Sequence, residues 1–126
     1  MLRKIDCVMV RVEDVSAAAD YYVGVMGLRR LWSDADGGHQ TVGLGFPETD
    51  AELVLHDDPG VPGPLNVHYL VEDVRLACDA LVGQGCALRV APFEIRIGWC
   101  ALLDDPFGTQ LCILDMSKGP RPVAAG

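Results

Sequence analysis

The sequence predicts an α+β fold built from two copies of one βαβββ module. Three observations support this prediction: an internal repeat, two amphipathic helix patterns, and strand patterns before and after each helix. With 126 residues, half of them hydrophobic, the chain can bury one sizeable core. The pattern alone still allows ferredoxin-like and other α+β arrangements of these elements.

The internal repeat starts in the first predicted strand and continues through the first predicted helix. Nine of seventeen aligned positions are identical between residues 8–24 and residues 67–83, an offset of 59. The identical residues of the first copy are Val8, Val12, Glu13, Asp14, Val15, Ala18, Asp20, Val23 and Gly24. Their partners are Val67, Val71, Glu72, Asp73, Val74, Ala77, Asp79, Val82 and Gly83. The chain is therefore predicted to be two related modules.

The predicted modules cover about residues 3–58 and 65–116 of a single domain spanning 1–126. Residues 57–64, rich in Pro and Gly, join them, because such a segment continues neither a strand nor a helix. The tail at residues 117–126 is predicted to be a loose end.

Each module is predicted to open with a strand rich in β-branched residues, at residues 5–12 and 65–71. Asp14 and Asp73 follow where a helix N-cap is needed. Apolar residues spaced i, i+3, i+4, i+7 then predict one amphipathic helix in each module, closed by Gly27 and Gly85. The remaining strands are predicted at residues 28–33, 39–46 and 52–56, and at residues 87–91, 95–103 and 109–114.

The formal net charge of −8 excludes some partners. Nucleic acids and anionic membranes need a basic surface, so neither is expected to bind. An acidic surface attracts cations, including cationic small molecules. The alternative is that the acidity only supports solubility.

Five cysteines, an odd number without CxxC spacing, argue against a disulfide framework or a zinc ribbon. They suit a reducing compartment. No apolar stretch approaches the roughly 20 residues that span a bilayer, and the start has no cleavage site typical of a secretory signal. The expected location is the cytoplasm. The sequence contains no GxSxG, HExxH or Gly-rich phosphate loop, so catalytic residues stay unassigned.

Two segments carry a resemblance to a known family. The opening segment IDCVMVRVEDVSAAADYYVGVMGL and the closing segment LLDDPFGTQLCILD, with its DPxG turn, resemble the vicinal oxygen chelate superfamily of glyoxalases, bleomycin resistance proteins and dioxygenases. The resemblance covers residues 3 to 116. It implies that the two modules pair into a curved open barrel with the helices outside, that a small ligand or a metal lies in the concave face, and that the protein is a homodimer.

Strand alternation predicts which side chains face that cavity. On the first strand they are Cys7, Met9 and Arg11. On the strand that opens the second module they are Asn66, His68 and Leu70. The closing strands add two further sets, namely Glu52, Val54 and His56, and Gln110, Cys112 and Leu114.

The resemblance also implies where a metal would bind. Metal-dependent members usually place His, His or Glu, His, and Glu at four strand positions. These positions correspond here to Cys7, to Val54 with His56 two residues on, to Asn66 or, if the alignment shifts by two, His68, and to Cys112. This set does not form the nitrogen-and-carboxylate site that Mn, Fe or Ni enzymes of this type use, so the usual metal site is predicted to be lost.

An alternative keeps a metal at other residues. Cys7, His56, His68 and Cys112 have cavity-facing positions and would form a Cys₂His₂ zinc site if all four converged. The simpler interpretation is that both cysteines pack as small hydrophobes and both histidines form hydrogen bonds at the cavity rim.

The segment 93–100 is a further candidate for ligand contact. Glu94 and Arg96, two residues apart on a predicted strand, would pair with each other or bind a polar ligand. Trp99 would offer a flat surface for stacking, and Trp32 is a similar candidate with a weaker case. The alternative is a salt bridge beside a core indole.

The leading hypothesis is a metal-free small-molecule-binding protein of the bleomycin-resistance type, without a cofactor. Its predicted ligand-binding residues are Cys7, Met9, His56, Asn66, His68, Arg96, Trp99 and Cys112. The second hypothesis is a lyase, isomerase or dioxygenase that uses a displaced metal or acid–base residues such as Glu94 or His68. A third is a dimeric regulatory module without a small ligand.

Overall fold

The structure is a computed structural model that describes every residue except 62, 64 and 120–126. Two helices and eight strands follow one another as strand, helix and three strands, twice over. The α+β class and the two βαβββ modules are thereby confirmed. Among the described residues, the chain divides into two compact units, one of residues 6–66 and the other of residues 1–5 and 67–119.

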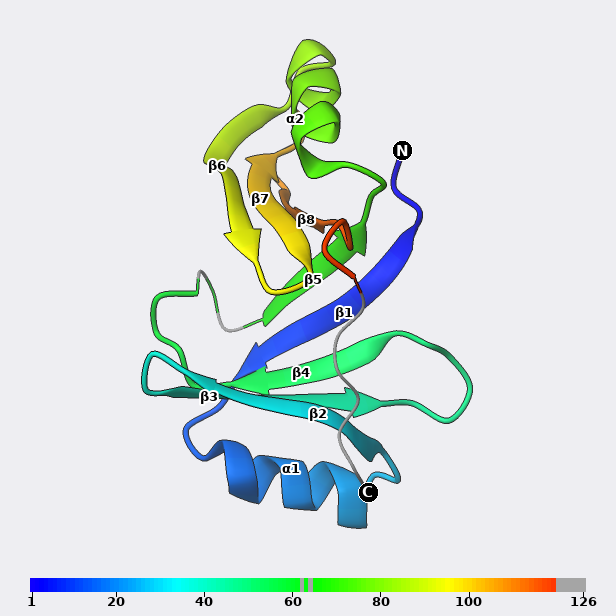
Figure 1. The fold of residues 1–126 in the computed structure, drawn as a ribbon, viewed down its shortest axis with the longest axis vertical. Helices are drawn as coiled ribbons and strands as arrows, with labels where there is room; N and C mark the ends of the chain where they lie inside the picture. The colour runs from blue at the N-terminus through cyan, green and yellow to red at the C-terminus, as the bar shows by residue number, and fades with distance from the viewer. Residues whose placement is uncertain (62, 64, 120–126) are drawn as a thin grey trace. The chain divides into compact units, whose positions relative to one another are not determined.

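In the first module, a four-stranded sheet carries one helix (Figure 1). Its elements are β1 (Lys4–Arg11), α1 (Val15–Gly24), β2 (Arg29–Asp36), β3 (His39–Gly45) and β4 (Glu52–His56). The strand order is β2-β3-β4-β1, with β1 parallel to β4 and the other neighbours antiparallel.

The second module repeats this arrangement. Its elements are β5 (Leu65–Leu70), α2 (Val74–Gly83), β6 (Ala87–Ile95), β7 (Gly98–Asp104) and β8 (Gln110–Leu114). The strand order is β5-β8-β7-β6, and only β5 and β8 run parallel. In both modules the helix leads from the first strand to the outermost strand, β1 to β2 and β5 to β6, while the first strand pairs in parallel with the last, β1 with β4 and β5 with β8.

Both helices begin as the sequence predicts. The carboxylate of Asp14 accepts a hydrogen bond from the Ala17 N–H at 3.0 Å, and that of Asp73 accepts one from the Leu76 N–H at 3.1 Å. Each bond pairs an amide that the first helical turn leaves unsatisfied. Gly27 and Gly85 follow the helices with φ of 84° and 106°, which a residue with a Cβ rarely adopts.

Each helix packs on one face of its own sheet. In the first module the core contains Val15 and Ala19 from α1 against Leu44 and Leu55 from β3 and β4. The second module buries Val74, Ala77 and Cys78 from α2 against Ala101, Leu103 and Ile113. The other face of each sheet is not covered by that module's helix.

Two predicted strand boundaries are wrong. The first is the end of β2, which reaches Asp36 instead of residue 33, and the second is the boundary between β6 and β7. The sequence predicts strands at 87–91 and 95–103, but β6 continues through Pro92 to Ile95 and β7 starts at Gly98. Proline is tolerated here because β6 is the outermost strand of its module. On its outer edge no neighbouring strand needs a hydrogen bond from the missing N–H. Glu94 and Arg96 consequently do not share a strand, because Arg96 lies in the turn after β6.

The carboxylate of Asp115 fixes the end of the second module. It accepts hydrogen bonds from the N–H groups of Val74 (2.8 Å) and Trp99 (2.9 Å). It also accepts bonds from the N–H and the hydroxyl of Ser117, at 3.2 and 2.8 Å. Gly98 must be a glycine, because a Cβ there would lie 2.2 Å from this carboxylate.

Residues 117–119 are hydrogen-bonded to the second module. The Lys118 N–H donates to the Ile97 carbonyl at 2.8 Å, and the Lys118 ammonium lies 3.2 Å from the Glu94 carboxylate. The rest of the tail predicted to be loose, residues 120–126, lies outside the described residues. Within the described part of the chain, neither helix has the length and apolarity to cross a membrane.

Candidate functional site

Three of the predicted site residues lie on one sheet face of the first module. The β1–β4 register pairs Cys7 with Glu52, Met9 with Val54, and Arg11 with His56. Because side chains alternate along a strand, all six point to the same face. The residues between them, such as Leu55, belong to the core under α1. The predicted alternation of β1 and β4 is therefore present in the structure.

Trp32 of β2 joins this face and is held there by two contacts. Its indole N–H donates a 2.6 Å hydrogen bond to the Glu52 carboxylate. The ring also lies over Gly43 of β3, where a Cβ would meet the indole Nε1 at 2.0 Å. Since Gly43 pairs with Val54, the indole covers the side of the sheet to which Val54, Glu52 and His56 point. The result is a flat, half-buried aromatic surface with a carboxylate at its edge.

His56 ends β4 on the same face and is 1% exposed. Its Nδ1 accepts a 3.1 Å hydrogen bond from the Asp58 N–H, so the neutral ring carries its proton on Nε2. Nε2 itself is buried and has no hydrogen-bond partner among the described residues. Burial lowers the pKa of His56, and Arg11 adds to the effect, although Asp58 opposes it. The ring is therefore neutral at neutral pH, with an N–H donor that no described group accepts.

In the second module, His68 and Cys112 share the face away from α2. They are directly paired in the β5–β8 register. Apolar side chains make up most of this face, namely Leu70, Ile97, Cys100, Leu102, Cys112 and Leu114. Burial raises the pKa of Cys112, and burial together with the nearby Cys112 raises that of Cys100 to about 12. Both thiols stay protonated at neutral pH, which removes them as nucleophiles.

The other predicted residues lie elsewhere. Trp99 is on the α2 side of its sheet, where the Arg75 guanidinium lies 4.6 Å from the ring centroid. Arg96 is exposed in the β6–β7 turn, away from the strand position predicted for it. Asn66 is buried, and its Nδ2 donates a long hydrogen bond of 3.5 Å to the Gly63 carbonyl. Trp32 is thus the tryptophan on the strand face, although the sequence made the stronger case for Trp99.

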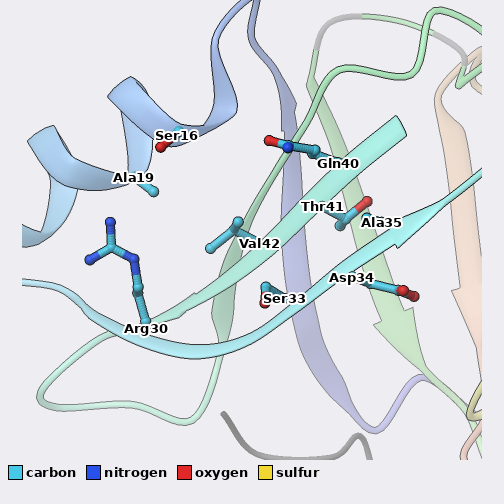
Figure 2. Close-up of a pocket in the computed structure, with 9 residues that line it drawn as sticks. All are labelled: Ser16, Ala19, Arg30, Ser33, Asp34, Ala35, Gln40, Thr41 and Val42. Carbon is cyan, nitrogen blue, oxygen red and sulfur yellow. The ribbon is translucent and has the colours of Figure 1, made fainter. Parts of the chain in front are cut away.

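The first module also has a cleft on its helix side, shown in Figure 2. Its volume is about 390 Å³, and its walls come from α1, β2 and β3. Most of the lining side chains that Figure 2 draws are polar, among them Arg30, Asp34, Gln40 and Thr41. Arg30 is already paired with Asp20. The cleft lies on the other side of the sheet from Trp32 and His56, and none of its lining residues was predicted from the sequence.

The residues at the family's metal positions do not fit a metal of the kind that its enzymes use. Val54 has no donor atom, and Cys112 supplies a thiol where the family commonly has a carboxylate. Cys7 is a buried cysteine where the family commonly has histidine. Among the residues that the structure describes, no three His, Cys, Asp or Glu side chains gather as a metal would require. Cys7 and His56 belong to one compact unit and His68 and Cys112 to the other, so the Cys₂His₂ alternative stays a prediction.

Solved structures with the same fold include methylmalonyl-CoA epimerases. The enzyme from Mycobacterium tuberculosis is 19% identical, with a TM-score of 0.75 over 96% of this chain and 90% of that one. A Streptomyces coelicolor methylmalonyl-CoA epimerase variant, in complex with 2-nitronate-propionyl-CoA, is 14% identical, with a TM-score of 0.76 over 93% and 99%. A hypothetical protein from Bacillus halodurans C-125 is 13% identical, with a TM-score of 0.73 over 94% and 97%. At these low identities, the similarity to these structures shows only that the fold is shared.

The chain belongs to the Glyoxalase/Bleomycin resistance protein/Dioxygenase superfamily, whose family model matches residues 4–113. The resemblance found in the sequence is thereby confirmed. The superfamily contains small-molecule-binding proteins and enzymes, and the chain is a member of that broad class. A search of curated proteins gave no significant match.

Proposed function

We propose that this protein binds a small molecule without a metal, in the manner of bleomycin resistance proteins, on the strand face of its first module. The observation that carries the proposal is the fixed position of Trp32. The indole N–H is bound to Glu52 and the ring lies over Gly43, so the aromatic surface is in place before a ligand arrives. A side chain that is already ordered loses less entropy on binding, which favours affinity.

The polar groups around Trp32 indicate what the ligand would carry. Glu52 supplies a negative charge beside the ring, and the whole chain has a net charge of −8. Both favour a planar ligand that is neutral or cationic, since an aromatic face and a carboxylate each attract positive charge. The His56 Nε2–H would donate to an oxygen or nitrogen acceptor. A buried donor left unpaired costs about 1–3 kcal/mol, so satisfying it would add to binding.

The remaining predictions belong to the same proposal. Cys7 and Met9 would line the site next to Glu52 and Val54 on the strand face. Asn66, His68, Arg96 and Cys112 stay predicted ligand contacts, whereas Trp99, on the α2 side of its sheet, is not part of this proposal. The homodimer, the cytoplasmic location and the absence of a cofactor also stay proposals.

An isomerase is the second candidate, because methylmalonyl-CoA epimerases are prominent among the proteins of similar fold. Such a reaction needs a group that removes a proton next to a carbonyl. Among the acid–base residues predicted from the sequence, Glu94 is exposed and paired with Lys118, which leaves His68 as the better base. Exchange of the C2 proton of methylmalonyl-CoA into D₂O, followed by NMR, would detect this activity. A rate that falls in His68→Gln would favour the enzyme over the binding protein.

Tryptophan fluorescence tests the binding proposal directly, because the chain has two tryptophans, on different modules. Trp99→Phe leaves Trp32 as the only reporter, and Trp32→Phe leaves Trp99 as a matched control. Each variant is titrated with cationic antibiotics, aromatic metabolites and CoA thioesters. We expect saturable quenching in Trp99→Phe and none in Trp32→Phe. If no compound changes the emission of Trp32, the proposed site is wrong.

A further inference from the structure

The cleft of Figure 2 has polar side chains on the α1 side of the first module's sheet. Ser16 comes from α1 itself, Ser33 from β2 and Gln40 from β3. Ser33 pairs with Val42, which packs against the core beneath α1, and Gln40 precedes Val42 by two residues. Because side chains alternate along a strand, Ser33, Gln40 and Val42 share this face. The cleft is therefore separate from the strand face that carries Trp32.

The second module shows what keeps this cleft open. At the repeat offset of 59, Ser16 corresponds to Arg75 and Gln40 to Trp99. The Arg75 guanidinium lies 4.6 Å from the Trp99 ring centroid, so the two side chains together cover β7 beside α2. The cleft next to α2 has described lining residues from α2 and β6 alone. In the first module the smaller Ser16 and Gln40 do not fill this space, so the cleft reaches β3.

The cleft also has an apolar part, which Ala19 and Val42 form. Ala19 is 1% exposed and Val42 is half-buried, and both pack in the core of the module. Around them, the hydroxyl groups of Ser16 and Ser33 and the side-chain amide of Gln40 can each donate and accept hydrogen bonds. The cleft therefore offers apolar contact together with hydrogen-bonding groups of both kinds.

The charges around the cleft balance one another. The guanidinium of Arg30 lines the cleft and is paired with the carboxylate of Asp20 on α1. Asp34 pairs with Thr41, which directs its side chain to the other face of the sheet, and Figure 2 shows it pointing away from α1. An anion would have to compete with Asp20 for Arg30, and it would approach a chain with a net charge of −8. These features favour a neutral ligand.

We propose that this cleft is a second binding site, for a small neutral polyol such as a monosaccharide or an inositol. Each hydroxyl group of a polyol donates and accepts hydrogen bonds, as the side chains of Ser16, Ser33 and Gln40 do. Its C–H groups would pack on the apolar part of the cleft. The cleft volume of about 390 Å³ lies in the range of small-molecule sites, about 300–1,000 Å³. The site goes beyond the proposed function, because it lies on the other side of the sheet and needs no part of the strand face.

NMR titration of ¹⁵N-labelled protein tests the site, with D-ribose, D-glucose and myo-inositol as probes. The backbone signals of Ser33 and Val42 and the side-chain amide signals of Gln40 should shift and saturate with at least one of them. Gln40→Ala should raise the Kd about three- to tenfold, the loss expected for one or two neutral hydrogen bonds. Gln84→Ala is the matched control, because Gln84 is exposed and follows α2 in the other module, and it should leave the Kd unchanged.

A second variant closes the cleft with residues that the chain already uses. Ser16→Arg combined with Gln40→Trp transfers the Arg75–Trp99 contact of the second module to the first, and it should abolish the saturable shifts. Circular dichroism and Tm verify that each variant folds, and Gln40→Ala decides the question if the double variant does not. The proposal would be overturned by no saturation with any of the three probes, by an unchanged Kd in Gln40→Ala, by saturable shifts in the folded double variant, or by saturation with inorganic phosphate alone. Quenching of Trp32 by a ligand reports the proposed function separately from all of these outcomes.

Discussion

The indole N–H of Trp32 is hydrogen-bonded to the carboxylate of Glu52 across Gly43, so that three strands of the first module together hold one aromatic ring. Trp32 and Glu52 are far apart in the sequence. The hydrogen bond sets the direction of the ring, and the missing Cβ of Gly43 provides the space in which it lies. The position of the ring therefore depends on Gly43 as much as on Trp32.

Gly43→Ala should displace the indole. The new Cβ would lie 2.0 Å from Nε1, which the ring can relieve only by leaving the sheet face. Overpacking of this kind costs about 1–3 kcal/mol of unfolding free energy. In a Trp99→Phe background we expect lower stability in urea and emission shifted to longer wavelength. Gly24→Ala is the matched control, because its Cβ would meet nothing within 4 Å. Equal stability and emission in both variants would contradict the packing described here.

Asp115→Asn should destabilise the second module. An amide cannot replace a carboxylate that accepts four hydrogen bonds, from Val74, Trp99 and twice from Ser117, and the loss should be about 3 kcal/mol. Urea unfolding at pH 7 measures it. Asp105→Asn is a control in an exposed turn, where the carboxylate accepts from the N–H groups of Phe107 and Thr109, and it should cost less.

The effect of Asp115 should depend on pH in a defined direction. Burial alone would raise the pKa of this carboxyl, but hydrogen bonds from Val74, Ser117 and Trp99 outweigh burial and lower it. A lowered pKa in the fold means that the stabilisation is fully present above the unfolded pKa, roughly 3.9. It is lost as the pH falls through the folded pKa. The stability gap to Asp115→Asn should therefore be constant from neutral pH down to that value and then shrink; a gap that widens on acidification would contradict this assignment.

His56 should make the protein less stable in mild acid. Because burial lowers its pKa, the unfolded state binds a proton before the folded state does as the pH falls below about 6.5. The folded protein therefore loses part of the unfolding free energy that it has above that pH. His56→Asn retains an acceptor near Nδ1 for the Asp58 N–H but does not titrate, so it should lose less stability between neutral pH and mild acid. His39→Asn is the comparison, since His39 is half exposed between Asp57 and Asp58. An unchanged pH slope in His56→Asn would show that His56 is not the group responsible.

The cysteines should differ in reactivity. Burial raises the pKa of Cys78, Cys100 and Cys112, and that of Cys100 reaches about 12, so little thiolate exists at neutral pH. Cys86 is only partly buried. We expect a thiol reagent to modify Cys86 first in the folded protein and all five cysteines in denaturant, as mass spectrometry of peptides would show. Rapid modification of folded Cys100 or Cys112 would indicate that their sheet face opens.

Much of the fold follows from local signals in the sequence. The N-cap aspartates and the positive-φ glycines predict where the helices begin and end, because each depends on neighbouring residues only. The 59-residue repeat predicts that the second module has the same order of elements as the first. The β6–β7 boundary does not follow in the same way. Pro92 normally ends a strand, and only its place on an outer strand makes it compatible with β6.

The candidate site was harder to predict than the fold. Alternation correctly placed Cys7, Met9 and His56 on one face, but it could not rank Trp32 above Trp99. That ranking depends on the register of β2 with β3 and β4, which brings Trp32, Gly43 and Glu52 together. A glycine inside a strand was the available signal, since it often marks a close approach of another group.

Metal content tests the central claim, which is ligand binding without a metal. Untagged protein is purified without chelator, exposed to Mn, Fe, Co, Ni and Zn, dialysed, and measured by inductively coupled plasma mass spectrometry. The quenching of Trp32 in Trp99→Phe by a bound ligand is then recorded with and without chelator. The account predicts far less than one retained metal per chain and quenching that chelator does not change. A near-stoichiometric metal, or quenching that chelator abolishes, would contradict it.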